Sequence, residues 1–117
     1  MIPTAKNSES LVTLVFEAGL YKNLINQLIK DFELAGLTIE LNEAIHPEKL
    51  VHILSKRIEQ ILEQHFDLYV QLLYRVDVPE QAMQSNLIQD TREMAQKASF
   101  AILQREWQKV YFKNQFS

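Results

Sequence analysis

Three acidic side chains recur every fourth residue and would form one row of carboxylates along a helix: Glu59, Glu63 and Asp67. Carboxylate rows build dimetal sites in four-helix bundles, where a Glu from each of two helices joins Glu-x-x-His pairs from the other two. The one Glu-x-x-His here, Glu43 to His46, directly precedes Pro47, and helical geometry is disfavoured before a proline. We therefore expect no metal site. The row is better interpreted as a solvated face or as a face that pairs with basic residues.

His65 is the second candidate, because it falls within an apolar stripe between Ile61 and Leu68. An imidazole has a reference pKa near 6.5, so it could act as a pH-sensitive group or a proton carrier. That role needs a carboxylate or a nucleophile from another helix, and the sequence does not place one. We interpret His65 as a core residue with one ring nitrogen in a hydrogen bond.

Three basic residues form the third candidate, and they also repeat every fourth residue: Arg105, Lys109 and Lys113. Trp107 and Tyr111 lie nearby, and cations beside aromatic rings are used to bind phosphates of single-stranded nucleic acid. The net charge of −3 gives no strong field toward nucleic acid, which we do not expect as a partner. The row also suits the C-terminal end of a helix, and it could face the acidic row or contact a protein.

Residues 31–48 hold Asp31 and four glutamates with no lysine or arginine. Such a run predicts a solvated loop, and its functional alternative is a surface that selects basic ligands.

No catalytic signature accompanies these residues. The sequence lacks a phosphate-binding glycine loop, an HExxH pair and a GxSxG turn, and it has no cysteine. Thiolate metal sites and cysteine nucleophiles are thereby excluded. We expect no enzyme activity, no catalytic residues and no cofactor.

Long helices must position these groups, since two glycines and three prolines in 117 residues are too few for many short strands. A first helix is predicted from Asn7 or Ser8 to Ala35, with Gly36 as its stop. Gly19 interrupts its pattern and could break or kink it. The turn-forming residues between 36 and 46 predict a connection.

A second helix is predicted from Pro47, a suitable first-turn residue, to about residue 75. It would be about 43 Å long at ~1.5 Å per residue, whereas a compact globule of this size has a radius of gyration of about 13 Å. The helices must therefore lie side by side in an elongated bundle, or one of them must bend.

The stretch LYRVDVPE ends this helix. Asp77 and Glu80 have the spacing of a capping box, which predicts a short third helix to about Ser85. Asp90 and Glu93 repeat the spacing and open the last helix. The fold expected is one all-α domain over 1–117, an elongated bundle of three long helices and a short one. Residues 1–7 and 114–117 are expected to fray.

The last two thirds of the chain resemble a family of small all-helical bacterial proteins with no established function. The resemblance is carried by the stretches YRVDVPE and AILQREWQKVYFK. The resemblance implies an all-α fold and a bacterial, cytoplasmic protein. It transfers no functional residues.

The first helix indicates self-association, because its apolar positions extend over most of its circumference and need a covering surface. We expect a homodimer with a contact surface at Phe16, Leu20 and Leu24, so polar replacements at Phe16 and Leu20 should give monomers or insoluble protein. The sequence has no stretch long enough to span a membrane and no convincing secretion signal, so we expect a cytoplasmic interaction module without a membrane partner. An unidentified protein is a further expected partner. The alternatives are a bundle that holds a small apolar ligand and a nucleic-acid-associated regulator.

Overall fold

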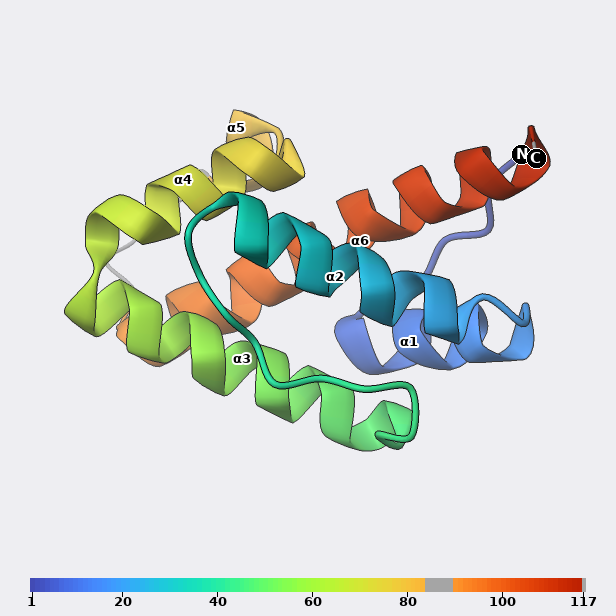
Figure 1. The fold of residues 1–117 in the computed structure, drawn as a ribbon, viewed down its shortest axis with the longest axis horizontal. Helices are drawn as coiled ribbons and strands as arrows, with labels where there is room; N and C mark the ends of the chain where they lie inside the picture. Colours follow the sequence, from blue (N-terminus) through green and yellow to red (C-terminus); the bar gives the residue numbers. More distant parts are fainter. Residues whose placement is uncertain (84–89, 117) are drawn as a thin grey trace.

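The computed structural model describes residues 1–83 and 90–116, and all regular secondary structure in these two ranges is helical (Figure 1). The prediction of an all-α fold is confirmed. Six helices lie in the described part of the chain: α1 Ser8–Glu17, α2 Tyr21–Leu34, α3 Pro47–Gln64, α4 Phe66–Val76, α5 Glu80–Met83 and α6 Thr91–Gln115. The predicted third helix is present as α5, and its expected end at Ser85 lies outside the described residues.

The first predicted helix is two helices, because the chain turns at Gly19. This residue has φ +77°, which glycine adopts without steric cost. Its N–H donates to the carbonyl of Phe16, and the N–H of Leu20 donates to Val15, which is the hydrogen-bond pattern of a Schellman helix end. Gly36 ends α2 in the same way with φ +79°, as predicted.

The second predicted helix is also two helices, and here no glycine or proline explains the break. His65 has φ −145° and ψ 66°, and it ends α3 and begins α4. Its side chain is exposed, so the prediction of a core histidine was wrong. The bend lets Tyr69, Leu72 and Val76 pack into the same core as α3. Tertiary packing thus outweighs the local sequence, which alone would continue the helix.

The capping predictions had mixed outcomes. The Asp90 carboxylate accepts a hydrogen bond from the Glu93 N–H at 2.8 Å, which confirms the start of α6. Asp77 instead closes α4, with φ +71° and the Val78 N–H bonded to the Leu73 carbonyl. The prediction that Asp77 caps the next helix was therefore wrong, although LYRVDVPE does end one helix just before another begins.

Helix α6 is the central element, and it contacts all five other helices. Its 25 residues give a length of about 37 Å at ~1.5 Å per residue, close to the longest dimension of the molecule, 38 Å. The other two dimensions are 28 and 25 Å, because the two broken helices fold back around α6. The result is a compact globule, with six helices in the described residues, and the more elongated bundle expected from unbroken helices is not seen.

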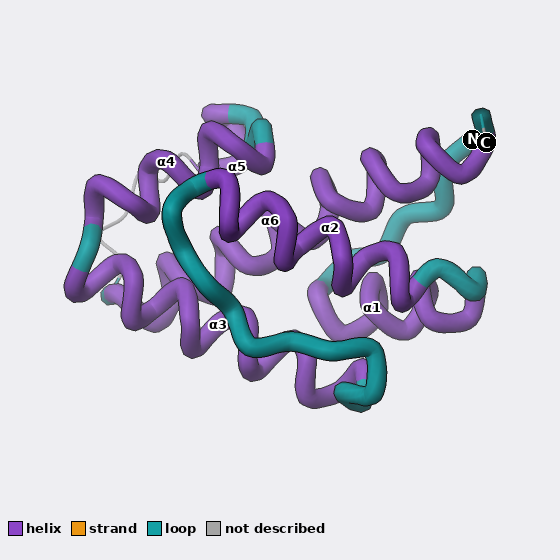
Figure 2. The backbone as a smooth tube through the Cα atoms, viewed as in Figure 1, coloured by secondary structure: helices purple, strands orange, loops and turns teal. Residues whose placement is uncertain are grey.

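Two non-helical segments are held against the helices (Figure 2). The connection between α2 and α3 crosses one face of α3, where Arg57 donates to the Thr38 carbonyl at 2.7 Å. The N-terminal residues, expected to fray, lie along the end of α6. There Trp107 donates to the Pro3 carbonyl at 2.8 Å, and the Tyr111 hydroxyl donates to the Met1 carbonyl at 3.2 Å.

Candidate functional site

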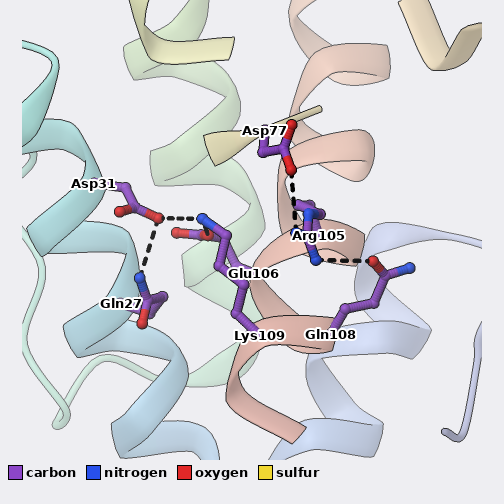
Figure 3. Close-up of polar contacts among 7 residues, drawn as sticks. All are labelled: Gln27, Asp31, Asp77, Arg105, Glu106, Gln108 and Lys109. Carbon is purple, nitrogen blue, oxygen red and sulfur yellow. Dashed lines mark hydrogen bonds and ion pairs between the residues drawn. The ribbon is translucent and has the colours of Figure 1, made fainter. Parts of the chain in front are cut away.

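The buried acidic side chains of α2 and α6 lie in one cluster of polar side chains (Figure 3). Asp31 on α2 is 4% exposed, and Glu106 on α6 is fully buried. Lys109, one turn after Glu106, places its Nζ 2.7 Å from Asp31 Oδ2 and 2.9 Å from Glu106 Oε1. Gln27, one turn before Asp31, donates from Nε2 to Asp31 Oδ2 at 3.2 Å. We call Gln27, Asp31, Glu106 and Lys109 the polar cluster.

The two carboxyl groups of the polar cluster do not share the same protonation state at neutral pH. Burial and, after it, the hydrogen bond with Asp31 raise the pKa of Glu106 to about 9, because the nearby Lys109 offsets only part of their effect. Burial alone would raise the pKa of Asp31, but hydrogen bonds from Glu106, Lys109 and Gln27 outweigh it and hold that pKa below its usual value. Glu106 is thus a neutral acid beside an ionised Asp31.

This assignment explains the hydrogen bonding of Glu106. Among the described residues, neither of its oxygens accepts a hydrogen bond of good geometry, even though Lys109 is close to one of them. A buried carboxylate without donors is strongly disfavoured, whereas a protonated carboxyl can donate to Asp31. The cluster then carries one negative and one positive charge, and its net charge is zero.

The two acids of the polar cluster are shielded from solvent, whereas Gln27 and Lys109 are half-buried, with 22% of the Lys109 side chain exposed. A shallow groove of about 340 Å³ lies beside it between α2 and α6, lined by Asn23, Asn26, Gln27, Lys30, Val110, Lys113 and Asn114. The ammonium of Lys109 between the two acids occupies the place that a divalent cation would need. The arrangement can hold a proton and an ion pair, and it stabilises one relative placement of α2 and α6.

The basic row predicted from the sequence is divided by the fold. Lys109 belongs to the polar cluster, and Arg105 forms an ion pair with Asp77 at 3.2 Å (Figure 3). Lys113 is exposed near the end of α6. Neither Arg105 nor Lys109 pairs with the predicted acidic row, whose Asp67 lies beyond the break at His65 while Glu59 and Glu63 lie on α3.

Sequence reasoning missed Glu106 and placed Asp31 wrongly in a solvated acidic run. A signal for both was present. Glu106 falls between Ile102 and Val110 at steps of four, on the inner face of the last helix. Asp31 follows Leu28 by three residues on the inner face of α2, and a charged residue in such a stripe must be paired when the stripe is buried.

The predicted self-association surface is divided between core and surface. Leu24 is fully buried within the chain, Leu20 is half-buried and Phe16 is 55% exposed. Phe16 also contacts the ring of Tyr21, with 5.6 Å between the ring centroids.

A more extensive apolar surface lies on α4, at the edge of the molecule beside α2 and α3 (Figure 1). Phe66, Val70 and Tyr74 recur every fourth residue there and are 58%, 48% and 76% exposed. Asp67, Gln71 and Arg75 form a parallel row next to them, and all three are exposed. We call these six residues the α4 face.

Two further grooves in the described part of the chain have both polar and apolar walls. One of about 750 Å³ lies where α1, α3 and α6 meet, and its walls include Lys6, His52, Arg92 and Phe100. A second groove of about 730 Å³ lies between α3 and the connection that crosses it. Both are open to solvent and are poor enclosures for an apolar ligand.

Within residues 1–83 and 90–116, no group of three or more histidine or acidic side chains is placed to hold a metal ion. None of the helices described is both long and apolar enough to cross a membrane. No known protein family, curated protein or solved structure matches this chain.

Proposed function

We propose that the protein is a small, non-enzymatic helical interaction module that associates with a second copy of itself, in the cytoplasm, and through this pair engages another protein. The observation that carries the proposal is the α4 face. It presents three large apolar side chains in a single row on the outside of a helix.

The spacing of these side chains separates them from ordinary exposed apolar residues. Single exposed apolar side chains are common on monomers and need no partner. A row at i, i+4 and i+8 is instead the pattern by which one helix contacts another. Transferring a side chain of this size from water to an interface contributes about 1.5–3 kcal/mol when burial is complete.

The rest of the molecule favours an interaction module over the alternatives. The larger grooves are open to solvent, whereas a small-molecule site usually encloses most of its ligand. Two of the three cations in the basic row already form ion pairs with acids of the same chain, which lowers the positive charge available to nucleic acid.

Sedimentation velocity over a dilution series tests the proposal. The α4 helix is about 16 Å long at ~1.5 Å per residue, and a face of that size gives a small interface with an affinity in the weak range. We expect the mass to rise from 13.7 kDa toward twice that value between about 1 µM and about 1 mM. A mass of 13.7 kDa across the whole range would contradict self-association.

Two polar variants then locate the contact surface. Tyr74→Ser should shift the association to higher concentration, whereas Phe16→Ser, the matched change on α1, should leave it unchanged. If Phe16→Ser weakens the association and Tyr74→Ser does not, the contact surface lies at Phe16, as the sequence predicted.

A further inference from the structure

The α4 face has a symmetry that identifies how it would be covered. Phe66 and Tyr74 lie four residues before and after Val70 in one row. In the parallel row, Asp67 and Arg75 lie four residues before and after Gln71. Each row therefore has a centre, with an aromatic residue at both ends of the first row and opposite charges at the ends of the second.

A two-fold axis perpendicular to α4 makes the two copies of this helix antiparallel. Each end of a row then faces the opposite end of the same row in the partner copy. Such an interface is isologous, so the residue that contacts a given position is fixed by the symmetry. With the axis passing between Val70 and Gln71, Phe66 meets the aromatic ring at position 74 of the second copy. Asp67 meets the guanidinium at position 75, and the two copies of Val70 lie near the axis.

The charges on the α4 face are free for this contact. Neither Asp67 nor Arg75 has a side-chain hydrogen bond or ion pair within the described residues, in contrast to the paired Asp77 and Arg105 nearby. A parallel arrangement of the two helices would instead place like charges together, which is repulsive.

We infer that the α4 face is a two-fold, antiparallel α4–α4 interface between two copies of this chain, held by Phe66, Val70 and Tyr74 and set in register by reciprocal Asp67–Arg75 pairs. This inference rests on the proposed self-association and specifies its partner, surface and geometry.

A charge-swap experiment tests the register. Asp67→Arg alone places guanidinium groups opposite one another at both symmetry-related positions, and Arg75→Asp alone does the same with carboxylates. Each should weaken dimerisation by about tenfold, since each change replaces two attractions with two repulsions. The double variant D67R/R75D restores opposite charges in the antiparallel pair, and its dissociation constant should return to within about threefold of the wild-type value.

Cross-linking tests the geometry independently, because the natural chain contains no cysteine. A disulfide requires Cα atoms within about 7 Å, a separation reached near the axis. Val70→Cys or Gln71→Cys should give a disulfide-linked dimer under mild oxidation. Lys49→Cys, an exposed position at the far end of α3, should remain monomeric under the same conditions.

The results separate this inference from the self-association on which it rests. A wild-type chain that stays monomeric at high concentration overturns both. The wild type could form a dimer whose dissociation constant is unchanged by both single charge changes and which gives no cross-link through position 70 or 71. That result overturns the α4 interface and leaves self-association through another surface. Weakening in the single variants without recovery in D67R/R75D overturns the antiparallel register.

Discussion

Glu106 is a fully buried acid, and its protonation links the fold to pH. In the unfolded chain a glutamate ionises near pH 4.5, whereas in the folded chain the pKa of Glu106 is about 9. Between these values the folded state holds one more proton than the unfolded state. This contribution to the free energy of unfolding is therefore complete below pH 4.5 and falls as the pH rises through this window, by on the order of 1 kcal/mol per pH unit.

Replacing Glu106 with glutamine should remove this dependence, because the amide keeps the shape and a hydrogen-bond donor but has no proton to lose. We expect E106Q to match the wild type near pH 4.5 and to be increasingly more stable than it toward pH 9. Urea unfolding at a series of pH values measures the difference. Glu33→Gln, at an exposed residue of α2, controls for the lost charge. Parallel curves for E106Q and the wild type would show that Glu106 ionises normally in the folded chain.

Lys109 should be the most sensitive member of the polar cluster. Lys109→Met leaves the buried, ionised Asp31 without its cation, a change that costs about 3–5 kcal/mol at fully buried pairs. Because Lys109 is partly exposed, we expect a loss of about 2–3 kcal/mol in the free energy of unfolding at neutral pH. Lys113→Met is the matched change one turn further along α6 and should stay within about 0.5 kcal/mol. Equal free energies of unfolding for the two variants would mean that Lys109 does not stabilise the ionised Asp31.

The residues of the polar cluster show why the interior site was harder to predict than the fold. Glu106 stands next to Arg105 and close to Lys109 in the sequence, so it looks like part of a solvated, mixed-charge surface. Its burial follows from α6 being covered on several sides at once, which depends on how the other helices fold back. A helix position can be assigned from periodicity, but the number of neighbours around that helix cannot.

At the scale of the helices, three ends share one backbone geometry. Gly19, Gly36 and Asp77 all have positive φ and follow the same hydrogen-bond pattern, but only the first two are glycines. The two glycine ends were visible in the sequence, since glycine is the usual residue there. The end at Asp77 was not, because an aspartate just before Val-Pro is equally suited to begin a helix.

Substitutions at two of these helix ends should change the free energy of unfolding in opposite directions. Gly36→Ala should lower the free energy of unfolding by about 1–2 kcal/mol, because a side chain is disfavoured in the left-handed conformation. No atom lies within 4 Å of the added Cβ, so the cost is that of the backbone alone. Thermal unfolding measures it, and an unchanged midpoint would mean that α2 ends differently.

Asp77→Gly should raise stability by up to about 1 kcal/mol, because glycine relieves the same strain. The change also removes the ion pair with Arg105, which contributes little because Asp77 is mostly exposed. Asp77→Asn is the control, since asparagine removes the charge and keeps a side chain that tolerates positive φ. A Gly variant less stable than the Asn variant would contradict the account of this helix end.

The break at His65 is the part of the fold that local sequence signals do not contain. A continuous helix from Pro47 to Val76 would be about 45 Å long at ~1.5 Å per residue, longer than the 38 Å of the whole molecule. Its second half would project beyond the core and leave Tyr69, Leu72 and Val76 exposed. The sequence predicted that a single long helix would require an elongated bundle or a bend, but it did not identify His65 as the residue at the bend.

At the scale of the whole molecule, the same break links the fold to the proposed function. By folding α4 back onto α2 and α3, it buries one side of that helix and turns Phe66, Val70 and Tyr74 outward. In the interior that the structure describes, the acids of the polar cluster are buried and lie against Lys109. The proposed contact lies instead on the outside of the molecule, at the α4 face.

Native mass spectrometry of freshly purified protein, set beside its denatured mass, tests the central claim of self-association most directly. We predict a species of twice 13.7 kDa with no added mass, and its loss in a Val70→Asp variant that places two carboxylates near the two-fold axis. A monomer at every concentration, or a species that carries a reproducible added mass, would contradict the account and favour a ligand-binding protein instead.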